Sequence, residues 1–383
     1  MSIALRRGAR RARHGSVSPR PPALFEHHPG LAGRIPHRRF LGQPTPVEPL
    51  ELPGLPRGRI FVKRDERSCP LYGGNKPRKL EFVIGEAVAR GARRLLTTGG
   101  LGTHHGLATT ILAREAGLDT TLVLVDQPLT DEVEESLLLF AAYGAELRYG
   151  RNVAGAAREC LRVLARGVLR REATRLVPTG GSGATGNLGF VSAGYELAAQ
   201  VRAGALPEPG TVYVAVGTGG TQAGLTVGLR LAGLRSPVVG VLATDILAPS
   251  SARIARAARA TLAKLRRADP SIPDLPLHPA DFPLLRDQLG PGYGAATDAA
   301  REAVAAAREA GLELETTYTA KCLAEILARG RSRALGSGPV LFWNTFGGVD
   351  AKARAPRPLD PAALPPALRR VLAERRPASR SAA

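Results

Sequence analysis

Two lysines, Lys76 and Lys79, stand three residues apart in the stretch GGNKPRKLEF, residues 73–82. Lysine is scarce in this chain, where only six of the 53 basic residues are lysines. A lysine amine can bond covalently to an aldehyde, whereas an arginine guanidinium stays protonated and cannot. Pro77 suits a first helical turn, which places Lys79 near a helix N-terminus, where the dipole favours the neutral, nucleophilic amine. The same spacing suits two solvated helix lysines equally well.

A second candidate element is VAVGTGGTQAGL, residues 214–225, which is typical of a strand, a tight glycine turn and a helix start. Backbone amides of such a turn can hold a phosphate. The candidate residues are Gly217, Thr218, Gly219, Gly220 and Thr221. A dinucleotide fingerprint is excluded because Gln222 stands where a third glycine is needed, and a Walker loop is excluded because no lysine follows. Glycine turns also occur for packing alone, so this loop by itself is weak evidence for a phosphate site. The presence of a lysine capable of covalent chemistry elsewhere in the chain strengthens that interpretation.

The elements that must position these residues alternate along the chain. Strands are predicted at 59–65, 93–99, 120–126, 146–150, 211–217, 237–244 and 340–346, with helical periodicity between them. This alternation predicts an α/β fold with mostly parallel sheets and helices on both faces. Glycine-rich segments at 99–106, 180–189, 217–224 and 347–348 come at strand ends, so we expect them to line one shared crevice.

Composition restricts the class of protein. Hydrophobic residues make up 44% of the chain, yet no apolar run reaches the ~18 residues of a membrane span. Cys69, Cys160 and Cys322 are scattered and lack metal-ligand spacing, so we expect all three to be buried in a protein of a reducing compartment. These features predict a soluble, cytoplasmic protein that makes no membrane contact.

The net charge of +20 is concentrated at the two ends of the chain. Residues 1–40 carry +8 and residues 351–383 carry +6, which leaves +6 for residues 41–350. We expect both ends to be poorly ordered tails, because their Arg-, Pro- and Ala-rich composition offers little apolar surface. Since the middle of the chain has no nucleic-acid-binding motif, nucleic acid is an unlikely partner except through these tails.

Several stretches together resemble a known family. They are PTPVEPL (44–50), FVKRDE (61–66), GGNKPRKLEF (73–82), PTGGSGATGNLGFVSAGYELAAQ (178–200), GTGGTQAGL (217–225), GPGYG (290–294) and TTYTAKCLAEIL (316–327). In this order they resemble the pyridoxal-phosphate (PLP) enzymes that group 1-aminocyclopropane-1-carboxylate (ACC) deaminase with D-cysteine desulfhydrase, within the tryptophan synthase β-like fold type II. The resemblance covers roughly 41–350.

The resemblance implies roles for single residues. Lys79 would be the lysine that bonds to the cofactor, Lys76 its non-covalent neighbour, and residues 217–221 the phosphate-binding loop. Asn75 would also contact the cofactor, and Thr345 would face its pyridine nitrogen, a neutral partner that suits elimination better than transamination. A second set of residues would act on the substrate side, namely Tyr293 and Tyr318.

The chain departs from the family pattern in GGLGTHHGLATT, residues 99–110. The family usually has Ser-Asn-His/Gln here, and Thr103 and His104 stand in the Ser and Asn places. Thr103 would approach the substrate and His104 the cofactor's phenolic oxygen, with Gly102 and His105 completing the substrate side. A metal held by the two histidines is unlikely, because neighbouring side chains point apart and no third ligand has suitable spacing.

The family also implies an architecture of two three-layer αβα domains with the active site in the cleft between them. The large, PLP-binding domain would comprise 41–85 and 186–350, and the small, substrate-side domain 86–185. Thr319 follows the desulfhydrase branch, where the deaminase branch usually has glutamate. The resemblance therefore implies a homodimeric PLP-dependent lyase with D-cysteine-like α,β-elimination of a small amino acid. ACC deaminase and a catalytically lapsed PLP- or amino-acid-binding homologue remain alternatives.

Overall fold

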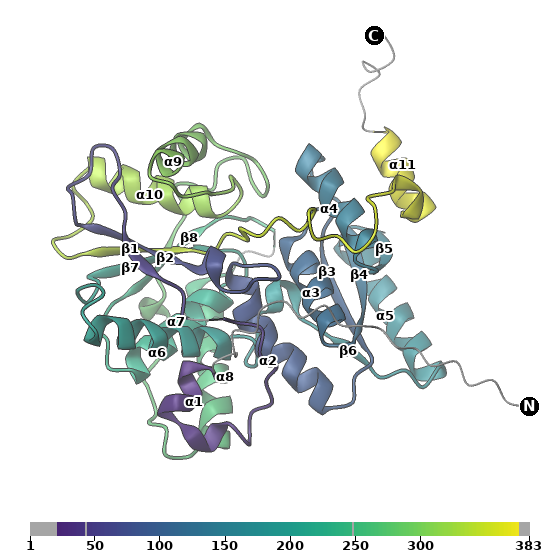
Figure 1. The fold of residues 1–383 in the computed structure, drawn as a ribbon, viewed down its shortest axis with the longest axis horizontal. Helices are drawn as coiled ribbons and strands as arrows, with labels where there is room; N and C mark the ends of the chain where they lie inside the picture. Colours follow the sequence, from purple (N-terminus) through teal and green to yellow (C-terminus); the bar gives the residue numbers. More distant parts are fainter. Residues whose placement is uncertain (1–20, 43, 247–248, 375–383) are drawn as a thin grey trace, which may run out of the picture.

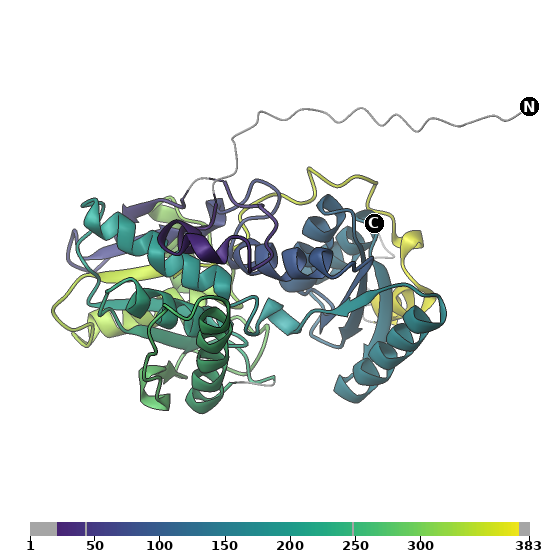
Figure 2. The same ribbon diagram turned by 90° about the horizontal axis from the view of Figure 1, so that it is seen from below.

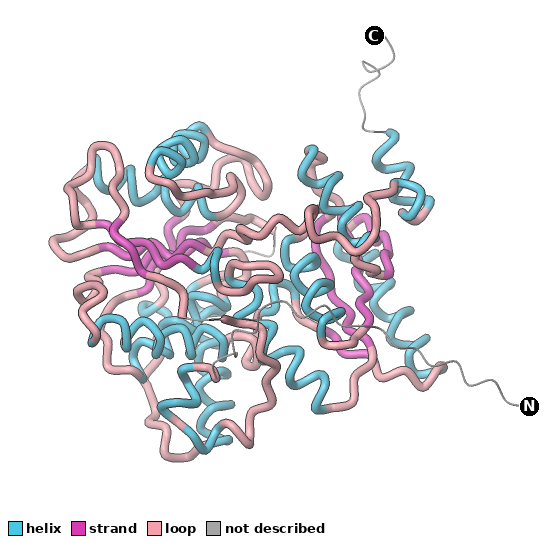
Figure 3. Tube along the Cα trace, in the orientation of Figure 1, coloured by secondary structure: helices cyan, strands magenta, loops and turns pink. Residues whose placement is uncertain are grey.

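A computed structural model describes residues 21–42, 44–246 and 249–374 (Figure 1). The strands gather in two groups, one in each lobe of the molecule (Figure 3). The strands are β1 (Val47–Pro49), β2 (Ile60–Arg64), β3 (Arg94–Gly100), β4 (Asp119–Val125), β5 (Glu146–Arg151), β6 (Thr174–Leu176), β7 (Thr211–Val216), β8 (Val238–Leu242), β9 (Leu284–Leu285) and β10 (Val340–Asn344). The helices are α1 (Ala23–His27), α2 (Asn75–Ala89), α3 (His104–Glu115), α4 (Asp131–Ala142), α5 (Val153–Leu169), α6 (Leu188–Arg202), α7 (Gly220–Leu231), α8 (Ser251–Ala268), α9 (Asp298–Glu309), α10 (Thr319–Arg331) and α11 (Pro366–Glu374).

The large domain contains a six-stranded sheet with the order β1-β2-β10-β7-β8-β9. Only β1 runs antiparallel to its neighbour, and the other pairs are parallel. Side chains alternate along β7: Val212, Val214 and Val216 face the core under α6, α7 and α8, whereas Tyr213 and Ala215 face the core under α9 and α10. This period of two gives three layers, with helices on both faces of the sheet.

The small domain contains a four-stranded parallel sheet with the order β5-β4-β3-β6. On β3, Leu95 faces the core under α2, α3 and α4, and Leu96 faces a smaller core under α5. The small domain therefore also has three layers. Within the described ranges, no helix combines the length and hydropathy that crossing a membrane requires.

All seven predicted strands are present, and the α/β fold with mostly parallel sheets is confirmed. The strands that were not predicted are the short β1, β6 and β9. They span three residues or fewer, which is too short for an alternating pattern to show in the sequence.

The prediction of a poorly ordered tail over residues 1–40 is wrong for its second half. Leu24, Phe25, Leu31 and Ile35 are buried in the core of the large domain, and α1 packs against α6 (Figure 2). The prediction used the net charge of residues 1–40 as a whole. Six of the nine arginines lie in residues 1–20, so this net charge did not describe the more apolar residues 21–40. Those first twenty residues lie outside the described part of the chain.

The prediction of a poorly ordered tail over residues 351–383 is likewise wrong up to residue 374. After β10 the chain leaves the large domain and crosses to the small one, where it ends in α11 (Figure 1). Leu364, Leu368 and Val371 are buried in the small-domain core, and Tyr143 Oη donates to the Ala351 carbonyl at 2.9 Å. The apolar spacing of three and four residues in this segment is that of an amphipathic helix.

Candidate active site

Lys79 is placed by the turn that precedes α2. Gly73 and Gly74 have φ of +83° and +71°, and Gly74 caps the helix. A Cβ on Gly74 would lie 2.6 Å from the Phe346 carbonyl oxygen, so only glycine lets this turn approach the loop after β10. The lysine therefore projects from the second turn of α2, at the junction of the two domains.

The Lys79 side chain is enclosed, with an exposed fraction of 2%. Its Nζ lies 2.9 Å from Ser182 Oγ and 3.4 Å from the Gly180 carbonyl oxygen. Burial, and secondarily the charge of Lys76, hold the pKa of Lys79 well below its ordinary value. Since a neutral amine is the nucleophilic form, the enclosure prepares Lys79 to bond to an aldehyde.

The predicted phosphate-binding loop lies at the same place. It joins β7 to α7, whose first residue is Gly220, and its left-handed Gly219 (φ +83°) caps the helix. A Cβ on Gly220 would lie 2.4 Å from Ser182 Oγ, so a side chain at this position would displace Ser182. Thr218 Oγ1 lies 2.5 Å from the same Ser182 Oγ. Ser182, which was not among the predicted residues, thus touches both the lysine and the loop.

One cavity of about 400 Å³ joins these groups. The predicted site residues that line it are Asn75, Lys79, Thr103, His104, His105, Gly217, Thr218, Gly219, Gly220, Thr221, Tyr293, Tyr318 and Thr345. Glycines from all four glycine-rich segments also line it, including Gly99, Gly180 and Gly347, which confirms the shared crevice. Gly102 is not part of the cavity lining, and its amide donates to Gln127 Oε1 at 3.1 Å.

The N-terminus of α3 faces the cavity from the small domain. Thr103 caps the helix, and its Oγ1 accepts a hydrogen bond from the Gly106 amide at 3.2 Å. The Thr103 hydroxyl can therefore still donate a hydrogen bond to another group. First-turn amides of a helix have no partner within the helix, so this end of α3 is suited to a carboxylate.

The two histidines have different surroundings. His104 Nδ1 lies 3.3 Å from the Tyr72 hydroxyl; enclosure lowers its pKa, Glu315 opposes this, and Lys76 adds to it. His105 is buried, with its ring nitrogens 3.0 Å from Thr97 Oγ1 and 3.4 Å from Thr109 Oγ1. Burial, with the charges of the two lysines, lowers the pKa of His105 to about 3. His105 is therefore neutral and has no free ring nitrogen for the predicted substrate contact.

The two tyrosines pack together on the substrate side of the cavity. The ring centroids of Tyr293 and Tyr318 are 6.0 Å apart in an edge-on arrangement. Burial raises the pKa of both phenols, so both are protonated near neutral pH and able to donate a proton.

Glu315 is a cavity residue that sequence reasoning missed. Its carboxylate accepts hydrogen bonds from the Tyr318 and Thr319 amides at the start of α10. Glu315 stands four positions before Thr319, the first residue of α10, so it does not occupy the N-cap position at which a sequence signal is sought. Thr319 is 1% exposed, bonds to Glu315 and is not part of the cavity lining. The branch argument built on Thr319 is therefore not supported by a substrate-facing position.

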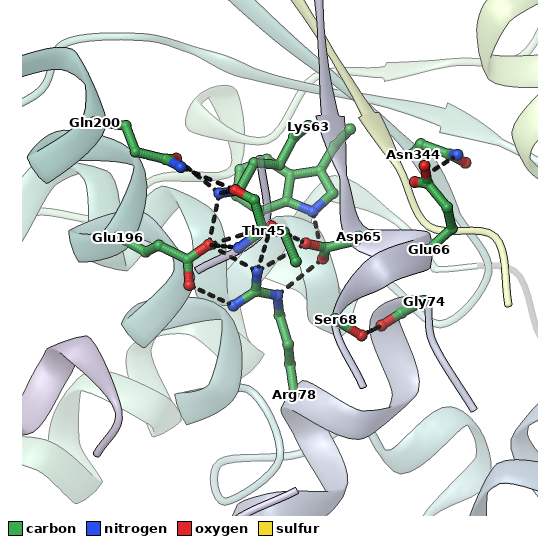
Figure 4. A network of polar contacts seen from close by, with 11 residues as sticks. Thr45, Lys63, Asp65, Glu66, Ser68, Gly74, Arg78, Glu196, Gln200 and Asn344 are labelled. Carbon is green, nitrogen blue, oxygen red and sulfur yellow. Dashed lines mark hydrogen bonds and ion pairs between the residues drawn. The ribbon is translucent and has the colours of Figure 1, made fainter. Parts of the chain in front are cut away.

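A buried charge network around Arg78, the residue before Lys79, was also missed (Figure 4). Arg78 bonds to both oxygens of Asp65 and to Glu196, and Lys63 Nζ lies 2.5 Å from Glu196 Oε1. Burial would raise the pKa of Glu196, but Arg78 and Lys63 hold it well below its ordinary range. The network ties α2 to β2 and α6, so it holds the helix that carries Lys79.

The residues fit one particular cofactor. A lysine that can bond to an aldehyde and a loop that can hold a phosphate share one cavity, and PLP carries both groups. Residues 217–221 of the loop line the cavity, and Thr345 supplies a neutral hydroxyl on the lining. With two αβα domains on either side, the fold and site define a PLP-dependent enzyme of fold type II.

Comparison with known proteins supports the assignment to the PLP-dependent enzymes. Residues 39–345 match the family of pyridoxal-phosphate dependent enzymes, and the chain belongs to that family. A solved structure described as an ACC deaminase homologue is 26% identical, covers 87% of this chain and 97% of its own, and superposes with a TM-score of 0.70. A hydrogen sulfide-producing enzyme from Fusobacterium nucleatum, at 15% identity and a TM-score of 0.53, covers 79% of this chain and 93% of its own and shows the shared fold alone.

Proposed function

We propose that this enzyme is a lyase that removes the β-substituent of a small amino acid by D-cysteine-like α,β-elimination. The observation that carries the proposal is the buried Lys79 amine at Ser182 Oγ, with its pKa held well below the ordinary value, in one cavity with the 217–221 loop and the N-terminus of α3. That combination supplies a base, a cofactor anchor and a carboxylate site. The predicted homodimer stays a prediction.

Each group has a separate task. The α3 amides and the Thr103 hydroxyl bind the substrate carboxylate. Lys79 Nζ accepts the proton that leaves Cα, because its depressed pKa keeps a lone pair available. Bound PLP supplies an electron sink for the charge that develops at Cα.

The phenols and water complete the reaction by protonating the leaving group and hydrolysing the unsaturated amine. The bond from Cβ to its substituent breaks, and the substituent leaves with the electron pair as a Cα–Cβ double bond forms. Tyr318 or Tyr293, both protonated, donates a proton to the leaving group. Water then converts the unsaturated amine to a keto acid and ammonia; with cysteine the leaving group is sulfide.

A second candidate is ACC deaminase. The observation that favours it is the 26% identity and TM-score of 0.70 to the structure described as an ACC deaminase homologue. The two candidates use the same lysine and loop and differ in the bond broken.

The test is a comparison of Lys79→Ala with Lys76→Ala. Purified wild type should show the visible absorbance of a lysine-bound cofactor and should release a keto acid from D-cysteine. Lys79→Ala should lose both, whereas Lys76→Ala should keep the absorbance. Keto-acid release from ACC alone favours the deaminase. If wild type shows the cofactor absorbance but releases no keto acid from D-cysteine, L-cysteine or ACC, both proposed activities are contradicted. If the cofactor absorbance persists in Lys79→Ala, Lys79 is not the lysine that bonds to the cofactor.

A further inference from the structure

Beyond the polar groups, one part of the cavity lining is apolar. It consists of Val125, at the end of β4; Val153, Ala156, Ala157 and Cys160, on the first half of α5; and Ile246, which follows β8. We call these six residues the apolar wall. Cys160 is only partly buried, which corrects the expectation that all three cysteines are buried.

Two side chains of the apolar wall are large and solvent-exposed. Seven large apolar side chains are exposed in the described part of the chain, and the two among them that face this cavity are Val153 and Ile246, exposed by 57% and 48%. Apolar area left in water is unfavourable, and a ligand that covers it gains affinity in proportion to the area. The thiol of cysteine or the cyclopropane ring of ACC is too small to cover two such side chains.

A charged group beside the wall, Asp126, already has a hydrogen-bond partner. Asp126 also lines the cavity, and its Oδ1 accepts a hydrogen bond from the Tyr149 hydroxyl at 2.5 Å. The wall comes from the small domain except for Ile246, whereas the cofactor loop belongs to the large domain and Lys79 lies on α2, which contacts α6 of the large domain and α3 of the small one. The polar and apolar parts of the lining therefore suit the two ends of one amphipathic molecule.

We propose that the apolar wall is a side-chain subsite and that the preferred substrate is an amino acid with an extended, uncharged apolar β-substituent. This inference rests on the proposed function, since it adds the class of leaving group to the elimination described above. Cysteine derivatives with an alkyl or aryl group on sulfur belong to this class.

Binding of amino acids that lack a leaving group tests the subsite without any turnover. Calorimetric titration of the PLP-loaded enzyme with norleucine and with alanine, each as both enantiomers, compares side chains that differ by three methylene groups. For at least one enantiomer, norleucine should bind about tenfold more tightly than alanine, since each covered methylene adds affinity. Equal affinity, tighter binding of alanine, or no binding of either overturns the subsite.

Matched variants on one helix locate the effect. Val153→Ser should reduce the preference for norleucine about threefold or more while alanine affinity is unchanged. Val168→Ser changes a valine that is 80% exposed near the far end of α5 and outside the cavity lining, so it should leave both affinities unchanged. If Val153→Ser weakens alanine equally, the wall serves domain closure instead and the subsite is overturned. If the enzyme prefers norleucine but turns over no β-substituted amino acid, the proposed function is contradicted and the side-chain subsite is supported.

Discussion

Lys79 Nζ lies 2.9 Å from Ser182 Oγ, although 103 residues separate them in the chain. Ser182 belongs to the segment that returns from β6 of the small domain to α6 of the large one, and its hydroxyl also contacts Thr218. A single serine therefore holds the reactive amine beside the phosphate-binding loop. Since Ser182 bonds to the amine and not to the sheet, its contribution is to the position of Lys79.

We expect Ser182→Ala to lower kcat/KM about fivefold to tenfold while the visible absorbance of the bound cofactor is kept, because one hydrogen bond contributes about 1 kcal/mol. Steady-state kinetics with an absorbance scan measure both. Ser271→Ala, in an exposed loop after α8, is the control. Unchanged kinetics in Ser182→Ala would show that the contact does not position the amine.

Lys321 holds the loop that carries Tyr293. Its Nζ donates to the Leu289 carbonyl at 2.7 Å and lies 3.3 Å from the Gly292 carbonyl, in a fully buried position. Lys321→Met removes both contacts, so kcat should fall about tenfold with the cofactor absorbance retained. Lys264→Met, which changes a lysine paired with Glu86 on α2, should leave kcat unchanged. A full loss of cofactor binding in Lys321→Met would mean that the lysine supports the fold rather than the tyrosine.

The buried network predicts an asymmetry between two arginines of the same segment. Arg78→Met leaves Asp65 and Glu196 without their shared cation, so the free energy of unfolding should fall by about 3–5 kcal/mol. Arg90→Met breaks an exposed pair with Glu86, and the loss should stay below about 0.5 kcal/mol. Urea denaturation of both variants measures the difference, and similar losses would contradict a structural role for the network.

The Lys76 side chain predicts how stability depends on pH. Burial lowers the pKa of Lys76 to about 8, with Glu315 opposing the shift, while the unfolded chain has a pKa of about 10.4. Between these values the folded protein has released a proton that the unfolded chain retains, so the free energy of unfolding rises with pH. Relative to Lys76→Met, cofactor-free wild type should gain about 2 kcal/mol between about pH 7 and about pH 9.5.

Urea denaturation at several pH values provides the measurement. Lys352→Met changes an exposed lysine paired with Glu135, so wild type should show no such gain over it. If the free energy of unfolding of wild type and of Lys76→Met changes with pH in the same way, Lys76 is solvated in the folded protein. That is the alternative interpretation of its spacing in the sequence.

Local pattern was enough to predict the seven longer strands and the glycine-rich strand ends. Each depends on neighbours within a few residues, namely alternating apolar side chains or a glycine turn. The choice of Lys79 came from the family resemblance, because its local spacing suited a solvated helix lysine equally well. Order at 21–40 and 351–374 escaped prediction because Leu24 and Leu368 are stabilised by surfaces from distant parts of the chain. Average charge does not report where a few apolar residues pack.

The amino-acid sequence by itself determined which groups could react and which loop could hold a phosphate, because those properties belong to side chains and short turns. Only the tertiary structure decided that Lys79 is enclosed and has a lowered pKa, that Ser182 and Glu315 belong to the site, and that Gly102, Thr319 and the ring nitrogens of His105 bond to other partners. Burial and hydrogen bonding between residues a hundred positions apart depend on how the two sheets place α2, α3 and the crossover beside each other, and no local pattern carries that information.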